Sequence, residues 1–244
     1  MQTLVFENAV ALAAAAAREL VSLLKHKPDA VVCMASGNSP KLTCEAFVTL
    51  AATEGIDTSR FFFIGLDEWV GITPDTPGSC HNDFRERLFL PLNMDPQRYH
   101  LFDGMSADLE QECRKMDQVI LDKGGIDLMI VGIGMNGHIG FNEPGCDMNA
   151  PAHVAKLEDI TASVGQKYFN TPMKLEYGIT IGLGHLKNSR RVLLIANGSS
   201  KAQIVHRAIH GPVSSELPAS VMQSLDHGMV MIDQDCAGAG MSRG

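Results

Sequence analysis

A glycine-rich segment at residues 132–145 carries three side chains suited to acid–base chemistry. Its sequence, Gly-Ile-Gly-Met-Asn-Gly-His-Ile-Gly-Phe-Asn-Glu-Pro-Gly, places an amide at Asn136, an imidazole at His138 and a carboxylate at Glu143. Histidine titrates near neutral pH, and Asn136 or Glu143 could orient its ring and set its tautomer. A lone histidine is usually structural, but glycine neighbours after a strand and a glutamate close behind favour catalysis. We therefore predict that His138 is catalytic.

The same segment formally contains the G-x-G-x-x-G pattern of dinucleotide-binding proteins, at Gly132, Gly134 and Gly137. That pattern has to open a helix directly after a strand. Here Gly140 and Pro144 interrupt any helix within two turns. We therefore reject a dinucleotide site and interpret the segment as a loop that presents polar side chains.

Two adjacent carboxylates, Asp67 and Glu68, follow an apolar run at residues 61–66. Successive side chains of a strand point to opposite faces, so the two carboxylates are expected to have different roles. A carboxylate at the end of so apolar a strand is partly desolvated, which raises its pKa toward the value that a general base needs. In isolation, an exposed acidic turn is the commoner explanation of such a pair.

Two turns that follow apolar runs are typical of anion-binding sites. Residues 36–40 (Ser-Gly-Asn-Ser-Pro) follow the first run, and we expect Ser39 to cap the next helix and Pro40 to be its first residue. Residues 197–201 (Asn-Gly-Ser-Ser-Lys) form a similar turn. Unpaired N–H groups and the helix dipole attract an anion, and Lys201 at a helix start indicates one beside it. A sugar phosphate or similar monophosphate ester is the expected ligand, and an ordinary capped turn with a solvated lysine is the alternative.

The elements that must position these groups are predicted by apolar runs of strand length at residues 31–35, 61–66, 128–133, 192–196 and 229–232. The runs are continuous rather than alternating, which is typical of strands buried on both faces of a parallel sheet. Helices are expected between them, at residues 7–26, 40–53, 81–88, 108–123 and 201–210. This alternation predicts an α/β fold of three layers, with a mostly parallel, Rossmann-like sheet and helices on both faces. Ligands bind at the carboxyl ends of such strands, where the polar groups above lie.

Residues 1–244 are expected to form a single domain, because no long linker or internal repeat divides them. Residues 145–177 are less regular, and we expect them to form a lid or small subdomain over one edge of the sheet. The apolar, alanine-rich residues 1–25 lack a basic leader and a cleavage site, so they are interpreted as a helix packed on the core.

Composition excludes several classes of partner. The chain has 20 Lys and Arg against 28 Asp and Glu, a net charge of −8. Without a run of basic residues we expect no nucleic-acid partner. No stretch reaches about 18 uninterrupted apolar residues, so no membrane partner is expected either. Six dispersed cysteines, with no C-x-x-C pair and no histidine at zinc-ligand spacing, predict reduced thiols in a cytoplasmic protein without a metal site.

Leu66-Asp67-Glu68-Trp69, together with the motif at residues 132–145, resembles the hexosamine-6-phosphate isomerase/deaminase family. The resemblance covers nearly the whole chain. The related 6-phosphogluconolactonases keep the Gly-His part of the motif but usually lack Phe-Asn-Glu-Pro. The resemblance implies aldose–ketose isomerisation with loss of ammonia: an amino-sugar 6-phosphate and water give a ketohexose 6-phosphate and ammonium. No metal or organic cofactor is implied, the partner is this small-molecule substrate, and a homo-oligomer stays open.

By this resemblance Asp67 corresponds to the general base that moves a proton between C2 and C1 of the sugar. His138 corresponds to the residue that assists opening of the pyranose ring, and Glu143 to its carboxylate partner. The positions that correspond to phosphate- and substrate-binding elements are Ser36, Gly37, Asn38, Ser39, Gly137 and Lys201.

Asn136 departs from the glucosamine-6-phosphate deaminases, which carry an aspartate there beside the histidine. An amide can orient an imidazole but cannot stabilise an imidazolium by charge, so Glu143 must provide more of the support. Asn136 and the sequence Gly78-Ser79-Cys80 are more similar to the galactosamine-6-phosphate branch, whose substrate we favour. Lys167 is the candidate for a phosphate-binding arginine of the glucosamine enzymes, and activation by an N-acetyl sugar is not expected.

Two other functions stay open on the sequence. A lactonase of the same fold would hydrolyse a sugar-phosphate lactone, with His138 activating water. A non-catalytic sugar-phosphate sensor is the second, because this fold also serves as the effector domain of certain transcriptional regulators. The first expected strand begins near Val31, which leaves no room for a DNA-binding segment ahead of the sheet.

Overall fold

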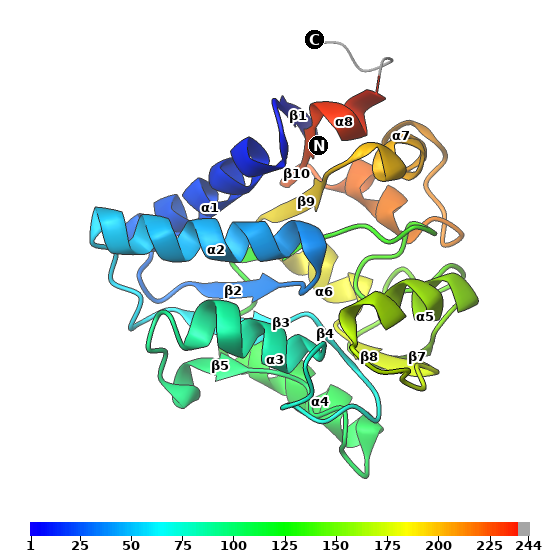
Figure 1. Cartoon of the computed structure of the whole chain (residues 1–244), viewed down its shortest axis with the longest axis horizontal. Coiled ribbons are helices and arrows are strands. Elements are labelled where there is room, and N and C mark those ends of the chain that lie inside the picture. The colour runs from blue at the N-terminus through cyan, green and yellow to red at the C-terminus, as the bar shows by residue number, and fades with distance from the viewer. Residues whose placement is uncertain (239–244) are drawn as a thin grey trace.

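The computed structural model describes residues 1–238 and, at Asn38, the backbone only. Its centre is a seven-stranded sheet in which every neighbouring pair of strands is parallel (Figure 1). The strands lie in the order β1 (Gln2–Phe6), β10 (Gly228–Asp233), β9 (Val192–Ala196), β6 (Leu128–Val131), β2 (Val31–Met34), β3 (Phe62–Gly65) and β5 (Tyr99–His100). The predicted mostly parallel sheet is confirmed.

Helices cover both faces of this sheet, because the strand side chains alternate between two apolar clusters. On β2, Val32 and Met34 belong to one cluster, whereas Val31 and Cys33 belong to the other. The first face is covered by α1 (Ala9–His26), α2 (Asn38–Glu54), α3 (Cys80–Phe84) and the π-helical turn Arg85–Phe89. The second face is covered by α4 (Leu109–Asp122), α6 (Leu183–Asn188), α7 (Ala202–His210), the 3-10 helix Pro218–Ser224 and α8 (Gln234–Ala237). The predicted three-layer α/β fold is therefore confirmed.

The prediction that residues 1–25 form one helix is wrong. Residues Gln2–Phe6 are strand β1, and α1 begins only at Ala9, where the Asn8 side chain accepts the Ala11 N–H at 2.9 Å. The sheet thus begins at Gln2 rather than near Val31. Within residues 1–238, strand β1 pairs only with β10, and it is not fully buried, so it lacks the continuous apolar run that marks the central strands.

A second, antiparallel sheet flanks the carboxyl ends of the main strands. It consists of β4 (Asp67–Trp69), β8 (Tyr177–Thr180) and β7 (His153–Lys156). The Ile181 N–H donates to the Leu66 carbonyl at 2.9 Å, so the small sheet continues directly from the end of β3. Between β7 and β8 lie α5 (Asp159–Gly165) and the 3-10 turn Gln166–Tyr168. This is the segment for which we predict a lid, and its ability to move stays a prediction.

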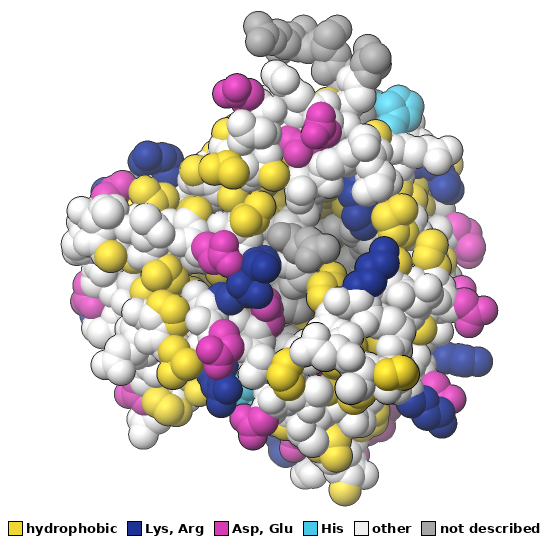
Figure 2. Space-filling view, in the orientation of Figure 1, with side chains coloured by type: hydrophobic (Ala, Val, Ile, Leu, Met, Phe, Trp, Pro, Cys, Tyr) yellow, Lys and Arg dark blue, Asp and Glu magenta, His cyan; other side chains and the backbone are white. Residues whose placement is uncertain are grey.

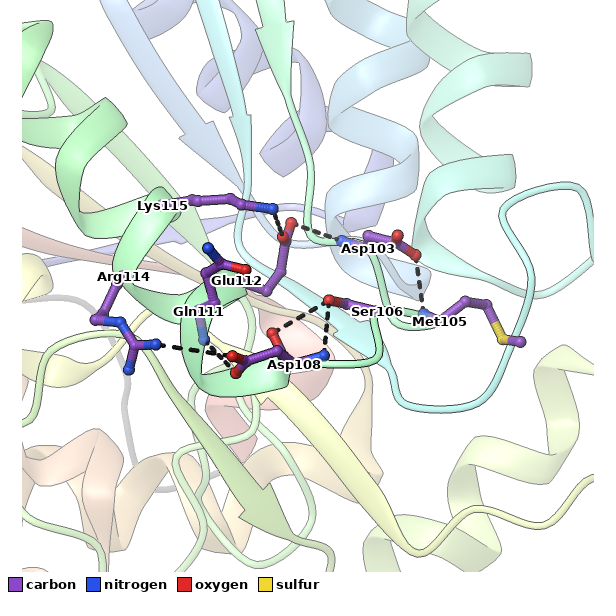
Figure 3. Close-up of polar contacts among 8 residues, drawn as sticks. All are labelled: Asp103, Met105, Ser106, Asp108, Gln111, Glu112, Arg114 and Lys115. Atoms are coloured by element: carbon purple, nitrogen blue, oxygen red, sulfur yellow. Dashed lines mark hydrogen bonds and ion pairs between the residues drawn. The ribbon is translucent and has the colours of Figure 1, made fainter.

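Helix α4 illustrates how acidic side chains hold a loop against a helix. Asp108 caps the helix by accepting the Gln111 N–H at 2.8 Å. The buried Glu112 accepts the Asp103 N–H at 3.1 Å and pairs with Lys115, which ties the preceding loop to the helix (Figure 3). The expected helix at residues 108–123 is confirmed to within one residue at each end. Among residues 1–238 no helix is long and apolar enough to cross a bilayer.

The chain changes direction across the sheet between β2 and β6. From β2 it proceeds to β3 and β5 on one side, whereas β6 leads to β9 and β10 on the other. Strands that diverge in this way leave a crevice at their carboxyl ends, which is where α/β proteins bind ligands. The crevice lies between the segments that follow Met34 and Val131.

Candidate active site

A cavity of about 630 Å³ lies at this switch point. Figure 2 shows the corresponding face of the molecule, where basic and acidic side chains surround a hollow. The sequence-predicted residues that line the cavity are Ser36, Gly37, Ser39, Asp67, His138 and Lys201. Segments far apart in the sequence thus converge on one space. Lys167, the predicted counterpart of a phosphate-binding arginine, lines it as well.

The first turn enters the cavity through a glycine in a left-handed conformation. Gly37 has φ +103° and precedes α2, whose first residue is Asn38. Ser39 therefore lies inside the helix and does not cap it, and Pro40 is its third residue, contrary to our prediction. The Ser39 hydroxyl instead donates to Asn197 Oδ1 at 2.5 Å and joins the two turns. The side chain of Asn38 lies outside the described part of the chain.

The second turn repeats this arrangement. Gly198 has φ +83° and precedes a single 3-10 turn, Ser199–Lys201, that leads into α7. The Lys201 ammonium donates to the Ile133 carbonyl at 2.6 Å, at the edge of the glycine-rich loop. Burial lowers the pKa of Lys201. Two helix N-termini and a half-buried ammonium therefore face the cavity, an arrangement that favours an anion.

Asp67 lines the cavity, whereas its neighbour Glu68 points away from it. Burial raises the pKa of Asp67 to about 7, and the negative charge of Glu68 adds to the effect. Glu68 is buried and accepts backbone N–H groups of Trp69, Cys80 and His81 at 2.8, 3.0 and 2.8 Å. Glu68 thus fixes the start of α3, while Asp67 has the basicity that a general base needs near neutral pH.

Glu143 contacts the His138 imidazole at Nδ1. His138 Nδ1 lies 3.3 Å from Glu143 Oε2 and 3.1 Å from the Thr161 hydroxyl. The Asn136 amide donates to the same Glu143 oxygen at 2.6 Å and therefore acts on the ring through Glu143. Gly134 is required beneath the imidazole, because a Cβ there would lie 2.3 Å from the ring.

Burial alone would raise the pKa of Glu143, but other groups outweigh it. A hydrogen bond with His138 and its charge, with hydrogen bonds from Thr161 and Asn136, hold the pKa of Glu143 below its ordinary value. Glu143 therefore stays ionised at neutral pH and can support a protonated imidazole. Its second oxygen, Oε1, is buried and has no hydrogen-bond partner in the described part of the chain.

Gly137, Asn136 and Glu143 do not line the cavity. The Gly137 N–H donates to the Gly134 carbonyl at 3.1 Å, and its carbonyl accepts the Ala219 N–H at 2.8 Å, so both backbone groups are already paired. A contact between Gly137 and a ligand stays a prediction without support from this geometry. Among residues 1–238 no cluster of three or more His, Cys, Asp or Glu side chains could hold a metal ion.

Sequence reasoning missed several residues of the cavity wall, including Cys80, Thr161 and Tyr168. Cys80 faces Asp67, Thr161 contacts His138, and the Tyr168 hydroxyl lies where a Cβ on Gly37 would meet it at 3.2 Å. Cys80 and Thr161 meet their partners through tertiary packing, so no local spacing predicts the contact. Both Thr161 and Tyr168 come from the predicted lid segment.

A parallel α/β fold whose switch point holds a basic carboxylate, a histidine–glutamate pair and two glycine turns at helix N-termini defines an enzyme of acid–base chemistry. The family described as glucosamine-6-phosphate isomerases/6-phosphogluconolactonase matches residues 6–231. The chain belongs to this family, and the predicted family and the prediction of an enzyme are confirmed.

Relatives of known name support this assignment. Glucosamine-6-phosphate deaminase 1 of Bacillus subtilis (strain 168) is 35% identical over 226 residues, which cover 91% of this chain and 92% of the relative. Glucosamine-6-phosphate deaminase of Halothermothrix orenii is 34% identical over 238 residues, 97% of this chain and 99% of the relative. A solved monomeric glucosamine-6-phosphate deaminase has a TM-score of 0.94 and 33% identity, covering 97% of this chain and 99% of the other.

The lactonases are more distant. A solved 6-phosphogluconolactonase from Thermotoga maritima has a TM-score of 0.75 and 20% identity, covering 95% of this chain and 98% of that one. At that identity the likeness concerns the fold alone. The lactonase alternative therefore gains no support beyond a common architecture.

Proposed function

We propose that this chain converts an amino-hexose 6-phosphate and water into a ketohexose 6-phosphate and ammonium. The observation that carries the proposal is one cavity lined by Asp67, with its pKa near 7, and by His138, which Glu143 supports. The C2 proton of an amino sugar is not acidic while the ring is closed. The reaction thus needs one acid–base group to open the ring and another to move the carbon-bound proton.

His138 is proposed to open the ring. Glu143 accepts a hydrogen bond from Nδ1, which leaves Nε2 to exchange a proton with the ring oxygen and the C1 hydroxyl. Opening gives a C1 aldehyde with the amino group at C2. The ionised Glu143 stabilises the imidazolium of His138 whenever both nitrogens of the imidazole carry a proton.

Asp67 is proposed to take the C2 proton of the open sugar and to return it to C1. As the C2 proton leaves, the C2 ammonium of the open sugar gives one proton to O1, so the product is a neutral enolamine. Return of the proton from Asp67 to C1 then gives a protonated imine at C2. Water then hydrolyses the imine, which releases ammonium and leaves the ketone. A carboxylate with a pKa of about 7 is matched to this task, because it accepts and returns a proton near neutral pH.

The 6-phosphate is proposed to bind between the two turns. The backbone N–H groups of the turn that begins at Ser36, those after Gly198, and the Lys201 ammonium supply donors and positive charge around one part of the cavity. Lys167 adds a second ammonium from the segment between β7 and β8. This arrangement anchors the end of the substrate that does not react.

Glucosamine 6-phosphate is the first substrate to test, since the curated relatives are named for it. Its C4 epimer, galactosamine 6-phosphate, is the second candidate. The observation that favours the epimer is Asn136, which binds Glu143 where the glucosamine branch is expected to carry a second carboxylate. Asn136 does not line the cavity, so it would act on the epimer only through Glu143 and His138.

Ammonium release tests the proposal. The purified protein is incubated separately with glucosamine 6-phosphate and galactosamine 6-phosphate, and hydrolysis of 6-phosphogluconolactone is followed in parallel. Ammonium from either amino sugar supports the proposal, and the larger kcat/KM identifies the preferred epimer. Rapid lactone hydrolysis without ammonium would establish the lactonase instead, and binding without turnover in all three assays would establish a sensor.

Other properties of the enzyme stay predictions. A homo-oligomer is measured by light scattering of the purified chain; the structural neighbour described as monomeric shows that one relative works alone. A cytoplasmic location is measured by fractionation of the cells that express it. Motion of residues 145–177 as a lid is measured by hydrogen exchange with and without substrate.

A further inference from the structure

Three polar side chains form a continuous chain along the wall of the cavity. The Ser36 hydroxyl donates to Cys80 Sγ at 3.0 Å, and the Cys80 thiol donates to Asp67 Oδ1 at 3.7 Å. The three residues come from three elements: the turn after β2, the start of α3 and the start of β4. All three line the cavity. These two hydrogen bonds therefore connect the first glycine turn to Asp67, the carboxylate for which we propose transfer of the carbon-bound proton.

Cys80 is neutral, which makes it a donor. Burial raises the pKa of its thiol well above the ordinary value, and the negative charges of Glu68 and Asp67 add to this shift. The neutral thiol has one hydrogen, which lies within reach of Asp67 and also of Glu68, while the sulfur accepts from Ser36. At 3.7 Å from Sγ, Asp67 Oδ1 is the acceptor on the cavity wall.

The sulfur is also fixed in place. The Cys80 N–H donates to Glu68 Oε1 at 3.0 Å, and the Ser79 hydroxyl caps α3 by accepting the Asn82 N–H at 3.0 Å. Cys80 is only 4% exposed. The sulfur therefore keeps its place beside Asp67.

A thiol is a weak hydrogen-bond donor, and this has a chemical consequence. A strong donor to an ionised carboxylate makes the carboxylate less basic. The Cys80 thiol orients Asp67 while lowering the pKa of Asp67 only slightly, so burial and Glu68 keep the carboxylate basic. A hydroxyl at this position would orient Asp67 as well but would weaken it as a base.

We propose that Cys80 is a positioning residue that orients the Asp67 carboxylate for transfer of the proton between C2 and C1 of the sugar, and that Ser36 links this orientation to the phosphate-binding turn. This inference rests on the proposed function. The titratable groups that face Asp67 are Glu68 on its own strand, Cys80 on α3 and Cys33 on β2. His138 lines the same cavity from the glycine-rich loop.

Two substitutions of Cys80 should act in opposite directions. Cys80→Ala removes the donor, so the pKa of Asp67 should rise by about half a unit. Cys80→Ser replaces a weak donor by a stronger one, so the pKa should fall by a similar amount. Loss of packing alone would not shift the pKa of Asp67 in opposite directions in the two variants.

The pKa of Asp67 is measured by ¹³C NMR titration of protein labelled at aspartate carboxyl carbons, with Asp67→Asn to identify the signal. The acid limb of the kcat/KM profile for ammonium release should move in the same direction as the titration in each variant. Cys80→Ala should also lower kcat about 10-fold with little change in KM, because a misaligned base slows the proton transfer and not binding. Equal pKa values in the wild type and both variants, or shifts of the same sign, would overturn the proposal.

Cys44→Ala is the matched control. Cys44 is 2% exposed and belongs to the same apolar cluster as Cys80, but it does not contact Asp67. The control should keep the Asp67 titration and the pH profile of the wild type. If Cys80→Ala does not fold, as judged by near-ultraviolet circular dichroism, Cys80→Ser alone decides, because a serine that leaves the titration unchanged refutes the contact.

The part of Ser36 is tested by a double-mutant cycle. Ser36→Ala should raise the pKa of Asp67 slightly in the wild-type background and should have no further effect when residue 80 is alanine. An equal shift of the Asp67 pKa in both backgrounds would show that Ser36 does not act on Asp67 through Cys80. A wild-type protein that releases no ammonium would refute the proposed function, whereas the NMR titration would still decide whether Cys80 acts on Asp67.

Discussion

Two carboxylates serve the same cavity, and their surroundings shift their pKa values in opposite directions. Burial and the negative charge of Glu68 raise the pKa of Asp67 to about 7, against only a weak thiol hydrogen bond from Cys80. Glu143 is also buried, but it meets an imidazole, a hydroxyl and an amide, and its pKa is lowered. The difference teaches that burial raises the pKa of a carboxyl unless charged and hydrogen-bonding partners outweigh it, which separates a carboxyl that exchanges protons near neutral pH from one that stays ionised.

Asp67→Asn should have the largest effect, because the amide cannot accept the carbon-bound proton. We expect ammonium release to fall at least about 10³-fold. Binding of the amino-sugar phosphate, measured by calorimetry, should change little, since the two turns that hold the phosphate are untouched. Turnover close to the wild-type rate would remove Asp67 from the mechanism and with it the contrast between the two carboxylates.

Glu143→Gln should lower kcat about 10²-fold. The neutral amide still occupies the space beside His138 but cannot stabilise an imidazolium by charge. Ammonium release across pH measures the loss, and the exposed Glu158, which precedes α5, supplies the control variant Glu158→Gln. A loss equal to that of the control would show that Glu143 does not support the histidine.

The same two carboxylates should affect stability with opposite signs. Because the folded pKa of Asp67 is raised from 3.8 to about 7, its ionisation destabilises the fold progressively as pH rises through that range. Asp67→Asn should therefore match the wild type near pH 4 and be more stable by about 2 kcal/mol near pH 8, a value reduced because the side chain faces the cavity.

Ionisation of Glu143 has the opposite effect on the free energy of unfolding. The pKa of Glu143 is lowered in the folded protein, so its ionisation stabilises the fold above the ordinary pKa of 4.5. Glu143→Gln should be less stable than the wild type at pH 7. The difference in the free energy of unfolding should shrink only as pH falls below the ordinary pKa of 4.5, where the carboxylate of the wild type becomes protonated. Urea unfolding at several pH values measures both variants. Two variants that shift stability in the same direction at pH 7 would contradict the split between the carboxylates.

How far the sequence predicts the fold depends on where a strand lies. The run at residues 192–196 matches strand β9 residue for residue, because a strand buried on both faces is apolar throughout. The edge strand β1 is partly exposed, so its residues do not stand out, and the prediction there is wrong. Asp67 and His138 are predicted because each lies in the segment that follows a central strand, His138 within a glycine-rich loop. Cys80 and Thr161 are not, because they meet their partners across 13 and 23 residues of chain.

Asn136→Asp tests the role of Glu143 with a smaller expected loss of activity than Glu143→Gln. The amide that donates to Glu143 at 2.6 Å becomes a second carboxyl group, and two such oxygens must share a proton. The pKa of Glu143 should rise, and the acid limb of the kcat/KM profile should move to higher pH. We expect about a 10-fold loss of ammonium release near pH 5.5 and little loss near pH 8. An unchanged acid limb would show that residue 136 does not act through Glu143.

Thr161→Val should have the smallest effect on this side of the cavity. The valine keeps the volume of threonine but removes the hydroxyl that lies 3.1 Å from His138 Nδ1, while Glu143 still holds the ring. We expect kcat to fall about threefold with KM unchanged, and Thr161→Ser to restore it, because serine keeps the hydroxyl. Since Thr161 belongs to α5 in the predicted lid, rescue by serine would mean that this segment takes part in orienting the histidine. Equal losses in the valine and serine variants would instead assign Thr161 to packing and leave Glu143 as the one partner that sets the ring.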